Sequence, residues 1–232
     1  MLRYNEHRLG EIAAGHNGVA KKLLESQAAD TETDWLSLLT SEGYEAARYE
    51  FIMVRPDLEG IPDLYLPAGL EVRAVQPEGY RAVWECAREA FRDDWCYVDA
   101  EWTDGALSAW QQEPTFDPSL WQVAWDGDQV AGMVLNFIDA EENREYGRRR
   151  GYTEGIAVRR PWRRQGLARA LIARSFRALK DRGMVDAALS VDAENPSGAL
   201  RLYTSLGFRV TKRSATYRKS MDGLGVAKCR TG

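Results

Sequence analysis

The sequence predicts an α/β fold in which helices cover both faces of a mixed β-sheet. Short segments with strand-like apolar patterns alternate with longer segments of helical periodicity along the chain. The clearest case lies at residues 151–173, where a strand pattern, an arginine-rich turn and a helix pattern follow one another. The apolar residues of this helix recur at helical spacing: Leu167, Leu171, Ile172 and Phe176. The rest of the chain is organised around this stretch.

Composition excludes several classes of protein. The 232 residues suffice for one complete domain and part of another. A net charge of −4 argues against general nucleic-acid binding, which needs a broadly basic surface. The longest apolar runs are too short for a bilayer and no signal segment opens the chain, so we expect a cytoplasmic protein without membrane partners. The cysteines and histidines do not have the spacing of metal ligands, so we expect no metal site. These residues are Cys86, Cys96, Cys229, His7 and His16.

The elements before the central stretch follow from local patterns. Residues 55–69 are rich in Pro, Asp and Gly and indicate a linker. Residues 70–75 alternate as a strand, and residues 77–91 form an amphipathic helix that Pro77 can start. The further predictions are a helix at about 100–112 in an acidic and aromatic segment, hairpin strands at 121–125 and 129–138 around Asp126-Gly127-Asp128, and a polar connection at 139–150.

The second half of the chain continues this alternation. The strand of the central stretch spans residues 152–158, and its helix ends at Arg182-Gly183. The further predictions are a strand at 187–191, a helix at 197–206, and two final strands at 208–210 and 215–221.

The turn at residues 163–168 is suited to bind phosphate. The first N–H groups of a helix have no internal acceptor, and the helix dipole adds positive potential there. Gly166 lets the backbone approach an anion, because it has no Cβ in the way. The sequence therefore predicts an anion site at the start of this helix.

Two motifs together resemble the GNAT (N-acetyltransferase) superfamily. The run Arg163-Arg164-Gln165-Gly166-Leu167-Ala168 meets the pattern Gln/Arg-x-x-Gly-x-Gly/Ala of that family's acyl-CoA pyrophosphate loop. About thirty residues later, Asn195 and the run from Ala199 to Phe208 resemble its Asn-x-x-Ala-x-x-Leu-Tyr-x-x-Leu-Gly-Phe signature. The resemblance covers about residues 66–221. It implies the GNAT fold, a splayed mixed sheet flanked by helices, and acetyl-CoA as co-substrate.

The resemblance also implies how acetyl-CoA is held. The turn binds the pyrophosphate, mainly through backbone N–H groups, and the strand pairs with the pantetheine amides where the sheet splays. Asn195 departs from the family pattern, because it lies eight residues before Tyr203 rather than seven. The expected acetyl-CoA contacts are Ile156, Ala157, Val158, Arg163, Arg164, Gln165, Gly166, Leu167, Ala168, Asn195 and Ala199.

The resemblance further implies that two residues transfer protons during the reaction. Glu154 lies four residues before Val158, where small-amine acetyltransferases of this family carry a glutamate that deprotonates the acceptor directly or through a water. Its alternative role is a salt bridge of the strand. Tyr203 matches the family tyrosine that donates a proton to the CoA sulfur, and its alternative role is buried packing.

The implied function is acetyl transfer to the amine of a small molecule by direct attack in a ternary complex. The acceptor is expected to contact residues 95–110 and 139–150. The first of these segments, being acidic and aromatic, suits a cationic and partly apolar amine, although a solvated helix face has the same composition. The alternatives are a protein N-terminal or lysine acetyltransferase and a non-catalytic acyl-CoA-binding module. We expect a monomer or homodimer.

The N-terminal segment resembles part of the C-terminal one. The run from Leu38 to Tyr44 parallels the run from Leu202 to Phe208 at an offset of about 164, which indicates an internal duplication. The predicted domains are therefore a degenerate, partial GNAT-like segment with its linker at 1–66, a complete GNAT domain at 67–222 and a flexible tail at 223–232. Such a tandem layout is similar to that of mycothiol synthase. An ordinary helix–turn–strand unit is the alternative.

Overall fold

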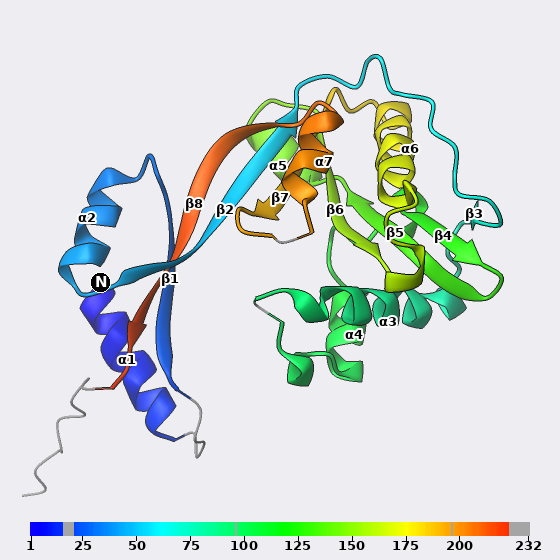
Figure 1. Ribbon diagram of the computed structural model, residues 1–232. Coiled ribbons are helices and arrows are strands. Elements are labelled where there is room, and N and C mark those ends of the chain that lie inside the picture. Colours follow the sequence, from blue (N-terminus) through cyan, green and yellow to red (C-terminus); the bar gives the residue numbers. More distant parts are fainter. Residues whose placement is uncertain (16–20, 96, 196, 223–232) are drawn as a thin grey trace, which may run out of the picture. The chain divides into compact units, whose positions relative to one another are not determined.

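The computed structural model describes residues 1–15, 21–95, 97–195 and 197–222 (Figure 1). Short 3₁₀ helices lie at Pro77–Gly79 (η1), Phe91–Asp93 (η2), Asp99–Glu101 (η3), Pro118–Leu120 (η4) and Arg160–Trp162 (η5). The helices are α1 (Leu2–Ala14), α2 (Thr33–Ser41), α3 (Tyr80–Ala90), α4 (Asp104–Trp110), α5 (Ala140–Glu145), α6 (Leu167–Asp181) and α7 (Ala199–Ser205), and the strands are β1 (Leu23–Ala29), β2 (Glu45–Arg55), β3 (Glu71–Val72), β4 (Gln122–Asp126), β5 (Gln129–Phe137), β6 (Arg150–Val158), β7 (Asp186–Asp192) and β8 (Arg209–Ser220).

The strands form one mixed sheet. Hydrogen bonds set the order β1-β8-β2-β7-β6-β5-β4-β3. The strands from β3 to β6 pair antiparallel with their neighbours, β1 pairs antiparallel with β8, and β6 pairs parallel with β7. The predicted α/β fold with a mixed sheet is thereby confirmed.

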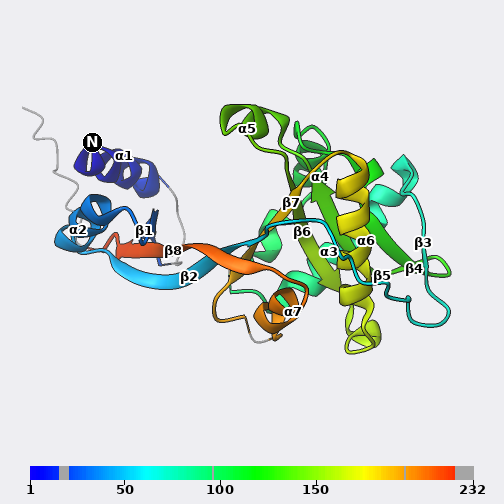
Figure 2. The ribbon, with the colours of Figure 1, turned by 90° about the horizontal axis from the view of Figure 1, so that it is seen from above.

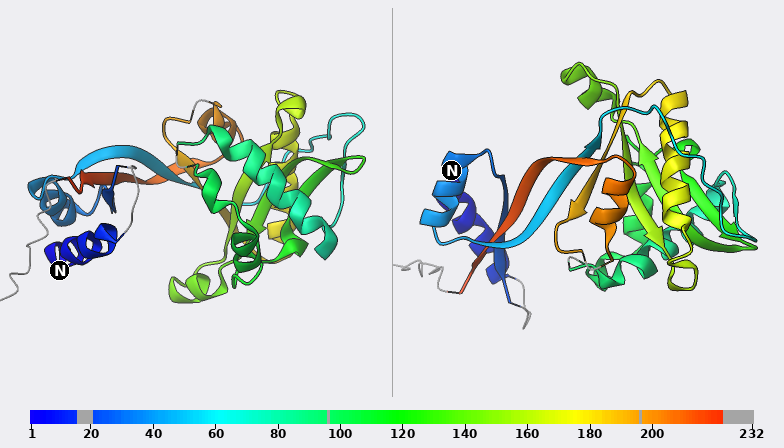
Figure 3. Two further views of the ribbon diagram at one scale, coloured as in Figure 1. Left: turned by 90° about the horizontal axis from the view of Figure 1, so that it is seen from below. Right: turned by 45° about the horizontal axis from the view of Figure 1, so that its top comes forward.

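Two compact units divide the chain. The first holds the described residues among 1–51, 192–194 and 212–232, and the second holds residues 52–191 and 195–211. In the first unit α2 packs on β1 through Leu24, Ala28, Leu39 and Tyr44. In the second, α3 and α6 lie on opposite faces of the sheet (Figure 3).

On one face of the sheet in the second unit, the burial of apolar residues explains why the predicted helix α6 forms. Its predicted apolar residues are all buried, together with Leu179. Gly151 of β6 allows the helix to lie close, because a Cβ at this position would overlap the Leu179 side chain. On the other face, α3 covers β4 and β5 with Val83, Cys86 and Ala87.

Three predicted elements differ from the structure. The two final strands were wrong: residues 209–220 form the single strand β8. Its first five residues are exposed and the polar run among them resembles a turn in the sequence, but pairing on both sides keeps the strand extended. The strand predicted at 70–75 shrinks to Glu71–Val72. The polar connection at 139–150 contains helix α5, which the Asp139 carboxylate caps by accepting the Glu142 N–H.

Three elements, β1, α2 and β2, recur along the chain as β7, α7 and β8, and Figure 2 labels all six. The elements β7, α7 and β8 begin within two residues of the positions that lie about 164 beyond the starts of β1, α2 and β2. The turn after each helix recurs as well. The Gly43 N–H donates to the Thr40 carbonyl (3.1 Å), and the Gly207 N–H donates to the Thr204 carbonyl (3.0 Å). Both glycines have positive φ, 83° and 90°.

Strands β6 and β7 are joined at one end by a buried ion pair. Arg150 lies directly opposite Asp186, and its guanidinium makes two hydrogen bonds to the carboxylate, at 2.8 and 3.0 Å. The side chains are only 16% and 17% exposed. Two residues earlier, Arg148 pairs with Glu142 at 2.7 Å.

Removing one partner of this pair is expected to destabilise the second unit. Asp186→Asn leaves the Arg150 charge partly buried without its carboxylate, so we expect the free energy of unfolding to fall by about 2 kcal/mol. Urea denaturation measures it. The control is Asp63→Asn, because Asp63 binds Arg177 at 3.2 Å but is 82% exposed. That variant should lose about 0.5 kcal/mol or less. Equal losses in both variants would contradict the prediction.

Candidate active site

The turn before α6 presents backbone N–H groups to solvent. Residues 163–166 are exposed, and both Arg164 (φ 62°) and Gly166 (φ 85°) adopt the left-handed conformation. The Ala170 N–H donates to the Gly166 carbonyl at 3.1 Å as the first helix-type hydrogen bond. The N–H groups of the preceding turn therefore have no acceptor within the helix. A Cβ on Gly166 would meet nothing within 4 Å, so the space in front of the turn is open.

Several side chains of the turn are used to shape it. The Arg163 guanidinium donates to the Val158 carbonyl at 2.8 Å and lies 3.7 Å from the Asp93 carboxylate. The Gln165 amide donates to the Pro161 carbonyl at 3.0 Å. The Arg164 side chain has no hydrogen-bond or ion-pair partner among the described residues. The backbone N–H groups and Arg164 are therefore the groups best placed for an anion.

The sheet opens beside this turn. Strands β6 and β7 pair only at their first residues, from Arg150↔Asp186 to Tyr152↔Ala188. Beyond them the Thr153 hydroxyl donates to the Ala188 carbonyl at 3.2 Å. The Ser190 N–H donates to the Glu154 carboxylate at 2.7 Å. The side chains of Thr153 and Glu154 thus make the hydrogen bonds to β7 that backbone groups make in a regular strand pair. Residues 156–158 of β6 have no register partner on β7.

A β-bulge in β6 accompanies the opening. The register with β5 shifts between Met133 and Leu135, next to Gly155, which has φ 57°. Such a bulge bends a strand and changes where its side chains point. A Cβ on Gly155 would lie 3.0 Å from the Leu135 side chain, which leaves little space for another residue. The bulge directly follows Glu154, whose carboxylate accepts the hydrogen bond from Ser190 of β7.

Tyr203 is buried near two carboxylates. It lies on α7, is 7% exposed and contacts the Phe208 ring edge to face at 6.1 Å. Burial raises the pKa of Tyr203, and the negative charges of Glu154 and Asp94 raise it further. The phenol is therefore neutral and can donate a proton. Tyr203 and Glu154, predicted from separate motifs, lie in the same part of the molecule.

The second predicted motif has a local role for its asparagine. The Asn195 side-chain amide oxygen (Oδ1) accepts the Ser197 N–H at 2.9 Å before α7. Gly198 has φ 81°, and Ala199 is the first residue of the helix.

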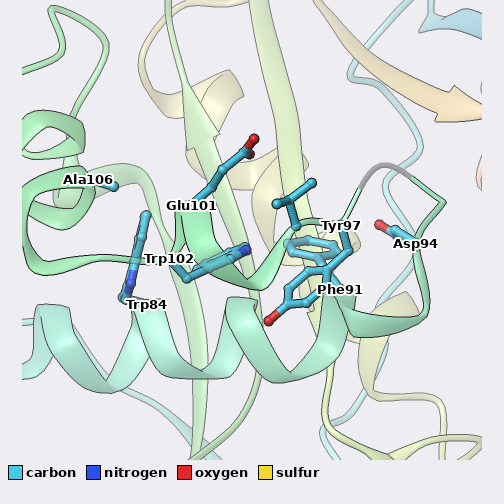
Figure 4. A pocket seen from close by; sticks show the side chains of 8 residues that line it. Trp84, Phe91, Asp94, Tyr97, Glu101, Trp102 and Ala106 are labelled. Atoms are coloured by element: carbon cyan, nitrogen blue, oxygen red, sulfur yellow. The ribbon is translucent and has the colours of Figure 1, made fainter. Parts of the chain in front are cut away.

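A pocket of about 530 Å³ lies between α3 and the segment that follows it (Figure 4). The lining is largely aromatic and carries two carboxylates, and it includes none of residues 139–150: Trp84, Phe91, Asp94, Tyr97, Val98, Glu101, Trp102 and Ala106. Asp94 links the pocket to Tyr203, whose pKa it affects. Sequence reasoning did not assign Asp94 or Trp84 to the site. The sequence feature that could have identified Trp84 is its position two helical turns before Phe91.

The described part of the chain lacks two other kinds of feature. It has no group of three or more His, Cys, Asp or Glu side chains that could hold a metal ion. None of its helices combines the length and the apolar character that crossing a membrane requires. Cys96 and Cys229 lie outside the described residues.

Sequence comparison finds one family and several relatives. The profile of the Acetyltransferase (GNAT) family matches residues 80–208. A mycothiol acetyltransferase from Thermobispora bispora is 31% identical over 178 residues, which are 76% of this chain and 59% of that protein. A mycothiol acetyltransferase from Frankia alni is 32% identical over 184 residues, 75% of this chain and 54% of that protein. The chain therefore spans less than three-fifths of the length of these relatives.

Structure comparison agrees. A GCN5-related N-acetyltransferase from Sphaerobacter thermophilus superposes with a TM-score of 0.75 at 30% identity, over 94% of this chain and 66% of that one. A tandem GNAT protein from the clavulanic acid biosynthesis pathway superposes with a TM-score of 0.68 at 13% identity, over 94% of this chain and 69% of that one. The second match is a likeness of fold.

Proposed function

This chain belongs to the acetyltransferase (GNAT) family, and we propose that it transfers an acetyl group from acetyl-CoA to the amine of a small molecule. The observation that carries the proposal is the neutral, buried Tyr203, whose pKa the charge of Glu154 raises, together with the parting of β6 and β7 beyond the pairs that precede Glu154. An acid and a carboxylate at one opening of a sheet suit a reaction that moves two protons.

The residues present fit acetyl-CoA. The open N–H groups before α6, the exposed Arg164 and the space in front of Gly166 suit its pyrophosphate. The edge of β6 at Ile156, Ala157 and Val158 lacks a β7 register partner, so its peptide groups suit the amides of the pantetheine arm. When bound, acetyl-CoA supplies the thioester-linked acetyl group.

The protein's own residues then move the protons. Glu154, directly or through a water, takes a proton from the acceptor ammonium, whose nitrogen needs its lone pair to attack. A carbon–nitrogen bond forms at the thioester carbonyl, the nitrogen releases its second proton to solvent, and the carbon–sulfur bond breaks. Tyr203 donates its phenolic proton to the departing sulfur and regains one from solvent.

Direct attack is favoured over an acyl-enzyme by the state of Cys86. This thiol is fully buried, and burial raises its pKa to about 11. A thiol that is both protonated and inaccessible is a poor nucleophile. The proposal is therefore a ternary complex of protein, acetyl-CoA and amine.

The test of Glu154 is its replacement by glutamine. We expect kcat/KM to fall about 100-fold at pH 7 and to recover as the pH rises, because the amine then loses its proton without help. Initial rates across pH measure this. Glu71→Gln is the control, because Glu71 is also a strand glutamate but is exposed on β3. A loss that is the same at every pH would contradict the base role and favour a structural role for the bond to Ser190.

Two alternatives have specific consequences. A protein N-terminal or lysine acetyltransferase would acetylate peptides in preference to small amines. A non-catalytic acyl-CoA-binding module would bind acetyl-CoA but acetylate no amine. The relatives are named mycothiol acetyltransferases, so amine-bearing compounds related to mycothiol belong in the acceptor screen.

We also infer that β1, α2 and β2 are a degenerate copy of β7, α7 and β8, as the predicted division at 1–66, 67–222 and 223–232 supposes. The recurrence of the elements and of the glycine turns supports this. Leu39 stands where the second copy has Tyr203. The first copy therefore lacks the acid.

A further inference from the structure

We propose that the aromatic pocket beside α3 binds a positively charged group at the non-reacting end of the acceptor, and that Glu101 is the ion-pair partner of that group. The acceptor is then a small amine with a second cationic centre, such as a diamine or an amine that carries a guanidinium. This inference rests on the proposed acetyl transfer, because it names the class of molecule that receives the acetyl group.

The first argument is the charge left at the pocket. Most acidic residues of this segment are paired with an arginine: Asp93 with Arg160 (2.9 Å), Asp99 with Arg88 (3.0 Å) and Asp104 with Arg81 (2.8 Å). Within the described chain, no lysine, arginine or histidine nitrogen lies within 4.0 Å of the Glu101 carboxylate. Glu101 is exposed and lines the pocket, which has no basic side chain in its lining. The pocket therefore keeps a negative charge that a ligand can neutralise.

The second argument is the aromatic wall below that carboxylate. The rings of Trp84 and Trp102 lie 4.6 Å apart, and the ring of Tyr97 stacks on Trp102 at 6.0 Å. Figure 4 shows Glu101 above Trp102, with Trp84 beside it. Cations bind the faces of such rings, tryptophan most strongly. A cation between Glu101 and these rings gains an ion pair and a cation–π contact together.

The third argument is the direction in which the pocket runs. Asp94 and Glu101 are both lining residues, and Figure 4 shows them apart along the pocket. The charge of Asp94 also raises the pKa of Tyr203, so the Asp94 end is taken as the one nearer the acid. The volume of about 530 Å³ suits a small molecule. An acceptor can place its reacting amine near Asp94 and its second cation near Glu101.

The experiment compares acceptors of equal length. We expect kcat/KM to be about tenfold higher for 1,5-diaminopentane than for pentylamine. In Glu101→Gln this advantage should fall to about twofold or less. Glu113→Gln is the matched control, because Glu113 is exposed outside the pocket, and it should keep the full preference. Equal values for the two amines in the wild type, or a preference that survives in Glu101→Gln, would overturn the proposal.

A binding measurement separates this inference from the proposed function. Trp84 and Trp102 line the pocket, so quenching of tryptophan fluorescence reports its occupancy without any turnover. The diamine should bind about tenfold more tightly than pentylamine, and Glu101→Gln should remove the difference. Absence of acetylation with every amine would refute the proposed transfer, yet the fluorescence titration would still decide the pocket. Equal affinity for both amines would refute the pocket's preference.

Discussion

Tyr203→Phe is expected to slow acetyl transfer about 100-fold while leaving acetyl-CoA affinity unchanged. The variant loses only the hydroxyl, and the remaining ring still packs against Phe208. Without the phenolic proton the sulfur departs as a thiolate, so kcat and kcat/KM should fall together. Steady-state kinetics and calorimetric titration of acetyl-CoA measure the two effects.

The pH profile provides a second readout of Tyr203. The reaction needs the neutral phenol, which is lost only as the pH rises through the pKa of the folded protein. Burial, Glu154 and Asp94 hold that pKa above the ordinary value of 10.0. The wild-type rate should therefore show no decline from tyrosine ionisation below pH 10. Tyr80→Phe is the control, because Tyr80 packs in the α3 core, and it should change the rate less than twofold. An unaltered rate in Tyr203→Phe would exclude the acid role.

Gly166→Glu is expected to weaken acetyl-CoA binding by about 100-fold or more. The φ of 85° strains any side chain, and the new carboxylate would project into the open space where the pyrophosphate is proposed to bind. Repulsion there opposes the attraction of the N–H groups before α6. Isothermal titration measures the affinity.

The far end of the same helix provides the matched control. Gly183 has φ 80° and also has nothing within 4 Å of its Cβ position, so Gly183→Glu introduces the same strain and charge away from the turn. It should keep wild-type affinity. Gly166→Ala separates strain from charge and should lose much less affinity than Gly166→Glu. Tight binding by Gly166→Glu would remove the turn from the acetyl-CoA site.

Local features of the site could be predicted from the sequence. The turn, its glycine and the helix that follows depend on neighbouring residues, and the structure has them within one or two residues of the predicted bounds. The strand that carries Glu154 and the helix that carries Tyr203 were likewise expected. The continuous β8 was missed, because its exposed and largely polar first half is kept extended by strands far away in the chain.

By itself the sequence determined the mixed α/β fold, the family and the position of the glycine-containing turn before α6, since helix periodicity and backbone conformation are properties of short segments. Only the tertiary structure decided where β6 and β7 part, that Glu154 bonds to Ser190, and that Asp94 lies near Tyr203. It also decided which carboxylates are neutralised: Asp93 meets Arg160 across 67 residues of chain, whereas Glu101 meets no cation within the described residues. Charge and burial depend on neighbours in space, and the chain brings those together only when it folds.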